Sequence, residues 1–294
     1  ANAFLGRPGA AGKVLAVLSG AVYLSATGGE ILWICREGSS LHRRGIGVPR
    51  MPLLTQGQGW FARPSGLAFD GGPEVNLEGA AGWVAPFPGP EEVASPKAVR
   101  AKFRQTLAVM DLLEIPDGMG PSTALVSALV NGRPGPLFVP GSLAELAKDR
   151  VGNLARDCLG RDLGSAVERA KELIGLGPGL TPSGDDYAGG LFFAAHSLSR
   201  AYPAIVPEEK GGRLAAFLEW ARTRTHPVSH AMLGDLAAGH GPGPLHEFLR
   251  ALLGREEDFL PAVDAALHLT RIGHASGWDM LAGFMTGMLF LEKA

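Results

Sequence analysis

The sequence predicts an α+β fold, in which a β-rich N-terminal module, barrel- or sandwich-like, precedes a mainly helical C-terminal domain. Up to residue 85, short runs of β-branched and aromatic residues alternate with Gly, Pro and Asp, as in a series of short strands. From residue 95 the apolar residues recur instead at helical spacing. We therefore expect two domains, residues 1–94 and 95–294, joined by a connector at 86–96 that contains four prolines.

In the N-terminal module each apolar run is short enough to be a single strand. Gly28 and Gly29 lie between two such runs and predict a hairpin turn, because glycine adopts the positive φ angles that tight turns require. The expected strands lie at residues 14–18, 21–24, 31–35, 59–62, 66–69 and 82–85.

The C-terminal domain begins with a clear helix signal. Ser95 followed by Pro96 is typical of an N-cap and first helical position, and Val99, Phe103 and Leu107 then mark one helical face. Further helices are expected at residues 122–130, 143–159, 163–173, 187–198, 213–224, 231–238, 244–253, 259–269 and 278–291.

Composition narrows the class of function. Of 294 residues, 46% are hydrophobic and 19% charged, with a net charge of −2, as in a compact globular protein. The absence of a basic stripe argues against nucleic acid as a partner. No apolar stretch reaches the ~18 residues of a membrane span, and no signal-peptide pattern is present. Cys35 and Cys158 form no Cys-x-x-Cys pair, so we expect reduced thiols in a cytoplasmic protein.

One short pattern occurs twice. Residues 183–190 and 276–283 both read S-G-x-D-x-x-x-G, and 276 − 183 gives a separation of 93 positions. A Ser-Gly pair before an aspartate and an apolar run is typical of a capped helix N-terminus. If the two helix ends converge, their backbone N–H groups form a pocket suited to a small anion.

The first copy ends a loop, residues 175–186, that is dense in glycine, proline, hydroxyls and carboxylates. A tight turn before a capped helix explains one aspartate and the prolines, but not the whole combination, so we favour a functional loop. The loop is neither a Walker loop nor a dinucleotide-binding fingerprint.

The second copy is preceded by His274, which either orients or protonates a substrate or caps the preceding turn. Asp186 and Asp279 occupy equivalent positions of the repeat. Facing one another, they would bind a metal, share a proton or fix the N–H groups of the opposite loop. The candidate catalytic residues are Asp185, Asp186, His274 and Asp279. The candidate substrate-binding residues are Gly177, Gly179, Leu180, Thr181, Ser183, Gly184, Ser276 and Gly277.

Two further segments have simple structural explanations. His226 and His230 have the spacing of a zinc pair on a helix, but Pro227 between them disfavours a regular turn, and Thr225 or Ser229 as an N-cap is preferred. Residues 41–47 form a basic, glycine-flanked loop that either receives an anion or is solvated. We assign no metal ligands.

The motifs at 175–186 (GLGPGLTPSGDD) and 273–283 (GHASGWDMLAG) resemble those of the bacterial AllH-type family, which includes a subunit of oxamate carbamoyltransferase from anaerobic allantoin breakdown. Residues 18–24 and 223–233 are also similar to it, so the resemblance covers most of the chain. It implies transfer of a carbamoyl group between oxalurate and phosphate, giving oxamate and carbamoyl phosphate. It also implies companion subunits, with a carbamate kinase downstream.

All these reactants are small anions, which helix-end N–H groups bind well. We therefore expect residues 177–181 and 276–277 to hold carboxylate or phosphate oxygens, Asp185 or Asp186 to position the amide nitrogen, and His274 to orient or protonate. No cofactor is predicted, since phosphate or carbamoyl phosphate enters as a substrate. The alternatives are a non-catalytic or regulatory subunit, or a stand-alone enzyme for another small carboxylate or amide. A homo-oligomer is compatible with each.

Overall fold

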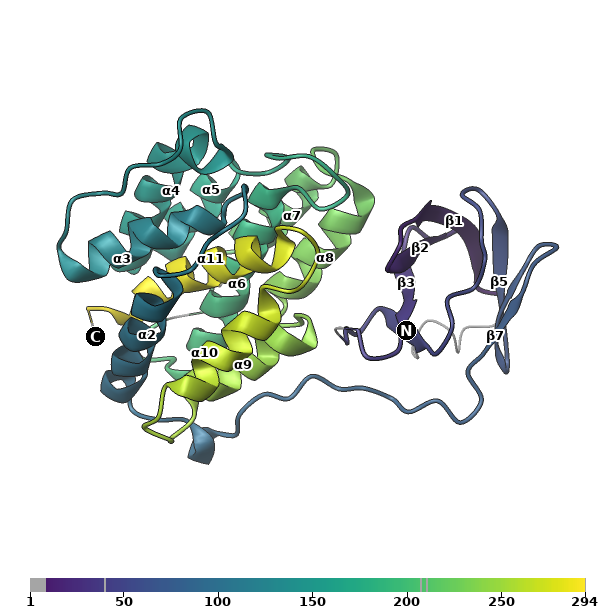
Figure 1. Cartoon of the computed structure of the whole chain (residues 1–294), viewed down its shortest axis with the longest axis horizontal. Helices are drawn as coiled ribbons and strands as arrows, with labels where there is room; N and C mark the ends of the chain where they lie inside the picture. Colours follow the sequence, from purple (N-terminus) through teal and green to yellow (C-terminus); the bar gives the residue numbers. More distant parts are fainter. Residues whose placement is uncertain (1–8, 40, 207, 210, 294) are drawn as a thin grey trace. The chain divides into compact units, whose positions relative to one another are not determined.

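The computed structural model describes residues 9–39, 41–206, 208–209 and 211–293. The chain divides into two compact units, Ala1–Ala85 and Pro86–Ala294, each with a hydrophobic core of its own (Figure 1). The first unit is a nearly closed, barrel-like sheet and the second is mainly helical, which confirms the predicted fold class.

The sheet of the first unit contains seven strands in the order β4-β3-β2-β1-β5-β6-β7. Neighbouring strands are antiparallel except β3 and β4, which are parallel. Alternate residues of β2, such as Val22 and Leu24, point into the core, as expected for a sheet with one buried face. The strands are β1 (Ala11–Val17), β2 (Ala21–Ala26), β3 (Ile31–Arg36), β4 (Gly45–Val48), β5 (Gly59–Arg63), β6 (Gly66–Phe69) and β7 (Glu74–Asn76).

Five of the six expected strands are present, and the hairpin turn between β2 and β3 contains Gly29 at φ +86°. Residues 82–85, expected to be a strand, have no regular structure, which corrects that prediction. Strands β4 and β7 were not expected. Both are short, and the glycines of β4 conceal the apolar alternation that marks a strand.

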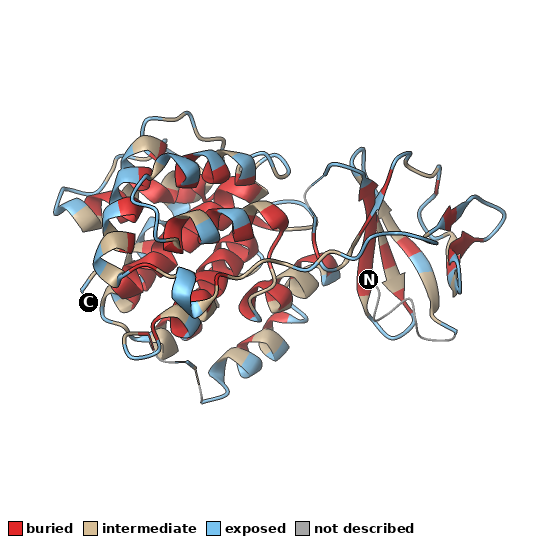
Figure 2. Cartoon of the chain, turned by 90° about the horizontal axis from the view of Figure 1, so that it is seen from below, coloured by how far each residue is buried: buried red, intermediate tan, exposed pale blue. Residues whose placement is uncertain are grey.

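The helical unit is built around two buried helices, α6 (Ser183–Ala201) and α11 (Ser276–Met288), which pack extensively against each other. Figure 2 shows mostly buried ribbon, in red, in the interior of the helical unit. The surrounding helices are α2 (Pro96–Met110), α3 (Thr123–Asn131), α4 (Leu143–Leu159), α5 (Leu163–Ala170), α7 (Arg213–Ala221), α8 (Pro227–Ala237), α9 (Gly243–Leu253) and α10 (Leu260–Leu269). Short 3₁₀ helices span Pro90–Glu92, Gly120–Ser122 and Leu289–Leu291.

Every expected helix exists, but three begin two or more residues earlier than expected. Helices α6, α8 and α11 start at Ser183, Pro227 and Ser276 instead of residues 187, 231 and 278, because their first turns contain polar residues, glycine or proline and lack the apolar pattern on which the prediction rests. The start of α2 is as predicted, since the Ser95 hydroxyl accepts a hydrogen bond from the Ala98 N–H at 3.3 Å.

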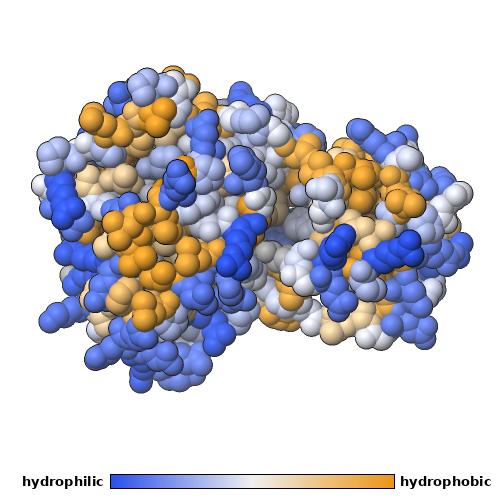
Figure 3. All heavy atoms as spheres, in the orientation of Figure 1, coloured by the Kyte–Doolittle hydropathy of each residue, from blue (hydrophilic) through white to orange (hydrophobic). Residues whose placement is uncertain are grey.

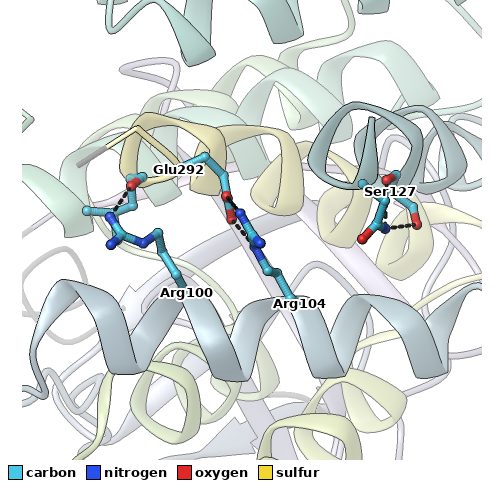
Figure 4. Close-up of polar contacts among 6 residues, drawn as sticks. Arg100, Arg104, Ser127 and Glu292 are labelled. Carbon is cyan, nitrogen blue, oxygen red and sulfur yellow. Dashed lines mark hydrogen bonds and ion pairs between the residues drawn. The ribbon is translucent and has the colours of Figure 1, made fainter. Parts of the chain in front are cut away.

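The end of the chain is fastened to α2 (Figure 4). Arg100 donates to the Leu291 carbonyl at 3.1 Å, and Arg104 pairs with Glu292 at 2.5 Å. Because the Glu292 side chain is only 5% exposed, this ion pair lies closer to the core than an ordinary surface pair.

On the face of the molecule shown in Figure 3, groups of hydrophobic residues lie between hydrophilic ones. The exposed large apolar residues of the helical unit include Leu112, Leu137, Val139, Leu146 and Leu260. Within the described residues, none of the helices has the length and apolar character that crossing a membrane would require.

Candidate functional site

The two copies of the repeat meet in the structure. The hydroxyls of Thr181 and Ser276, which precede or begin the two helices, are 3.1 Å apart. Farther along, the Tyr187 hydroxyl lies 2.5 Å from the Thr286 hydroxyl. Since contacts advance in the same direction along both helices, α6 and α11 run parallel and their N-termini lie side by side.

Each copy directs its serine toward the aspartate of the other copy. The Ser183 hydroxyl hydrogen-bonds to Asp279, and the Ser276 hydroxyl faces Asp186. Neither serine caps its own helix, because both are first helical residues and the N-cap positions are Pro182 and Ala275. The prediction of serine caps is therefore wrong. Instead, the serine hydroxyl of each copy contacts the aspartate of the other copy.

Glycine permits this close approach. A Cβ at Gly190 would overlap the Met280 carbonyl oxygen, and one at Gly283 would overlap the Tyr187 carbonyl oxygen. These contacts are related by the repeat, since Tyr187 and Met280 are also equivalent positions. Gly184 and Gly277 are tight in the same way against the carbonyls that precede each helix, those of Leu173 and Leu269. The glycines of the motif thus fix the packing of the helices.

Asp185 takes no part in these contacts between the copies, and both of its carboxylate oxygens accept hydrogen bonds from other segments. Its Oδ1 accepts the Gly175 N–H at 2.7 Å, and its Oδ2 accepts the hydroxyls of Ser229, at 2.6 Å, and Thr225. The side chain ties the glycine-rich loop to the start of α8. Thr225 and Ser229, proposed as N-caps of α8, do not have that role, since His226 Nδ1 accepts the Val228 N–H instead.

Asp279 holds a third segment that the sequence did not single out. Its Oδ1 accepts the N–H of Met119 at 2.6 Å and of Gly120 at 3.0 Å. A Cβ at Gly118 would lie 2.6 Å from the same oxygen, so only glycine fits there. The Asp-Gly and Gly-Pro pairs within residues 117–121 are a turn signal that could have identified this segment.

The Asp279 carboxyl lies in an environment that favours its neutral form. Burial raises its pKa from the usual 3.8 to about 6, and Asp117 adds to the rise. Hydrogen bonds from Ser183, Met119 and Gly120 oppose this effect.

Asp186 is the exception among the three carboxyls. It is 3% exposed, and its Oδ2 has no hydrogen-bond partner among the residues that the structure describes. Burial raises its pKa well above its usual range, and Asp279 and Asp185 raise it further. The hydroxyls of Ser276 and Thr181 lower it in part. Its surroundings therefore favour the neutral form of Asp186.

The remaining candidates form the outer part of the site. Gly179 and His274 are exposed, while Gly177, Leu180, Thr181 and Ser276 are partly exposed. Gly177 and Gly179 adopt φ of +111° and +93°. The two inner backbone donors are already used: the Gly184 N–H donates to the Leu176 carbonyl at 2.9 Å and the Gly277 N–H to the Ile272 carbonyl at 3.0 Å.

The positive N-termini of the two helices offset negative charge on the carboxyls of the site. Two parallel helices place two N-termini together, each equivalent to about +0.5 charge. The first turns contain the three carboxyls, Asp185 and Asp186 in α6 and Asp279 in α11. The site therefore combines positive helix ends with acidic groups, of which Asp186 is the most strongly held in the neutral state.

Metal ligation has no support within the described chain, where no group of three or more His, Cys, Asp or Glu side chains is arranged to hold an ion. His230 Nε2 lies 2.9 Å from the Leu218 carbonyl and His226 caps α8, so both histidines are engaged with backbone. Cys35 and Cys158 are free and buried.

No solved structure matches the chain. The family model described as oxamate carbamoyltransferase subunit AllH matches residues 173–288, which contain both copies of the repeat and the loops before them. The resemblance predicted from the glycine-rich motifs is thereby confirmed over residues 173–288.

Proposed function

We propose that this chain is a subunit of an oxamate carbamoyltransferase and binds a small carboxylate or amide anion where the two copies of the repeat meet. The observation that carries the proposal is the family match over residues 173–288, which spans both copies and both preceding loops. Companion subunits follow from the designation as a subunit. We place the complex in the cytoplasm, in line with two free, buried cysteines.

The proposed reaction transfers a carbamoyl group between oxamate nitrogen and phosphate oxygen. Starting from oxalurate, the bond between the carbamoyl carbon and the oxamate nitrogen breaks, and a bond from that carbon to a phosphate oxygen forms. A phosphate proton passes to the leaving nitrogen, so that oxamate and carbamoyl phosphate are the products. Stabilising the negative charge that develops on the carbamoyl oxygen requires fixed donors, and losing one such donor costs about 10²–10³ in rate.

The donors available for this role lie at the partly exposed rim. The hydroxyls of Thr181 and Ser276 are adjacent, and residues 177–181 contribute backbone N–H groups at the positive ends of two helices. We assign oxygen binding to these groups and proton transfer or orientation to His274, which is exposed. Of the two carboxyls expected to position the amide nitrogen, Asp185 or Asp186, we retain Asp186, because both oxygens of Asp185 already accept hydrogen bonds.

The test is reconstitution. The purified chain is assayed for oxalurate formation from oxamate and carbamoyl phosphate, alone and together with its companion subunits. A stand-alone enzyme turns over without partners, whereas a catalytic subunit needs them. In the active complex, Thr181→Val and Ser276→Ala lower kcat if this site is catalytic, and Ser199→Ala, far along α6, serves as the control. No turnover with any partner would refute the proposal.

A second candidate, a non-catalytic subunit, is favoured by one observation. Asp185 and Asp279 are saturated by hydrogen bonds that hold loops together, as in a purely structural element. Under this alternative, the companion subunits need this chain for assembly, and the Ser276→Ala complex is as active as the wild type.

A further inference from the structure

The two aspartates of the repeat are equivalent in sequence but differ in their surroundings. Asp279 Oδ1 accepts two backbone N–H groups, and the Ser183 hydroxyl also binds this carboxyl. Asp185 accepts three donors. Asp186 Oδ2, in contrast, is buried without a partner in the described part of the chain. A buried polar atom without a partner costs about 1–3 kcal/mol. Such a cost is typical of functional sites, where a ligand supplies the missing partner.

We propose that Asp186 is the ligand-contacting carboxyl of this site, where its Oδ2 accepts the amide N–H of a small carboxamide anion such as oxamate, and that Asp279 is a positioning residue. This inference rests on the proposed function, which it deepens by selecting one carboxyl and one ligand class.

The position of Asp186 suits this role. The two hydroxyls that face it belong to Thr181 and Ser276, which are partly exposed and 3.1 Å apart. The buried carboxyl of Asp186 therefore contacts two residues that reach the surface. The N-termini of α6 and α11 converge at the same point and favour the negative end of the ligand. A carboxamide next to a carboxylate matches both features, since the amide supplies N–H donors and the carboxylate supplies the charge.

The raised pKa of Asp186, which favours its neutral form, strengthens the match. The charged and titratable groups that face it are Asp279 and Asp185, with Asp117 facing Asp279. A neutral acid beside them adds no repulsion to an incoming anion and keeps an acceptor oxygen for the amide. Its ionised form would repel the ligand, so binding should weaken when the pH rises far enough to ionise Asp186.

The experiment measures ligand affinity of the full chain by calorimetry, independently of turnover. Oxamate is compared with pyruvate, which has the same charge and nearly the same shape but lacks the N–H donor. The wild-type chain should prefer oxamate by about 10- to 100-fold, the value of a hydrogen bond to such a group. Asp186→Leu should remove this preference. Asp186→Asn, which mimics the neutral acid, should retain it and should no longer lose affinity at high pH.

Asp279→Asn is the matched control from the other copy. It should lower the melting temperature by loosening the Met119–Gly120 segment, while the oxamate preference persists. Absence of oxamate binding by the wild-type chain, an unchanged preference in a folded Asp186→Leu chain, or loss of binding in Asp186→Asn would each overturn the inference. Failure of carbamoyl transfer with an intact, Asp186-dependent oxamate preference would refute the proposed reaction alone.

Discussion

At the scale of single residues, three buried carboxyls within one small region have three different roles. Asp185 joins the glycine-rich loop to α8, Asp279 holds residues 118–120, and Asp186 keeps a free acceptor. These three roles could not be distinguished from the sequence, because an Asp in the first turn of a helix is favoured for structural reasons alone.

Asparagine substitutions should separate these roles. Asp185→Asn places an NH₂ group against hydroxyls or an N–H that need an acceptor, so we expect a loss of about 2–3 kcal/mol in unfolding free energy. Asp186→Asn keeps one oxygen to accept the Ser276 and Thr181 hydroxyls, but it places an NH₂ group at the buried Oδ2 position, which has no partner in the described part of the chain, so we expect a smaller loss of about 1 kcal/mol. Urea unfolding at pH 7 measures both. Equal losses in the two variants would contradict the assignment.

The raised pKa values also predict the pH dependence of stability. An acid whose pKa is higher in the folded chain binds more protons there than in the unfolded chain, so stability falls as pH rises between the two pKa values. For Asp279 this window runs from 3.8 to about 6, and the raised pKa of Asp186 adds a decrease of the same sign. Unfolding free energy measured from pH 4 to pH 8 should therefore contain a component that decreases with pH. Asp186→Asn should remove part of that decrease, and an unchanged profile would count against the raised pKa of Asp186.

At the scale of elements, the parallel pair α6 and α11 depends on glycines that allow the backbones to touch. Gly190→Ala and Gly283→Ala each insert a methyl group into an opposing carbonyl. We expect each to destabilise the chain by about 1–3 kcal/mol or more through overpacking, although alanine raises helix propensity. Thermal unfolding gives the magnitude.

The control is Gly234→Ala in α8, where a Cβ would meet no atom within 4 Å. There the propensity gain of about 1 kcal/mol should appear without opposition. If Gly190→Ala were as stable as Gly234→Ala, the close contact between α6 and α11 would be incorrect.

Most helices and strands could be predicted from the sequence, whereas the contacts between them could not. Apolar periodicity located every helix and five strands, because both signals are local. The glycines of β4 and the three residues of β7 gave too little pattern. In the site, the repeat led to the expectation that the two helix starts converge, and the Thr181 and Ser276 hydroxyls lie 3.1 Å apart there. The exchange of serines between copies, and the role of Met119 and Gly120, depend on tertiary contacts over more than ninety residues.

At the scale of the whole molecule, the two units have separate cores. The core of the first lies within residues 14–77, and that of the second runs from Ala94 to Leu291. We propose that they are independent domains. Residues 86–294 expressed alone should unfold in one cooperative thermal transition with the helical content of the unit, measured by circular dichroism. A fragment without such a transition would show that the units need each other.

The parallel pairing of α6 and α11 also has a consequence during synthesis. The first copy leaves the ribosome 93 residues before the second. At 5–20 residues per second, this delay lasts roughly 5–20 s. Until then the face of α6 that packs against α11 stays uncovered, and Asp186 lacks the Ser276 hydroxyl. A chain that terminates before Ser276 stays in this condition permanently, which makes truncated products targets for proteolytic removal. The site is completed only when the second copy has also been made.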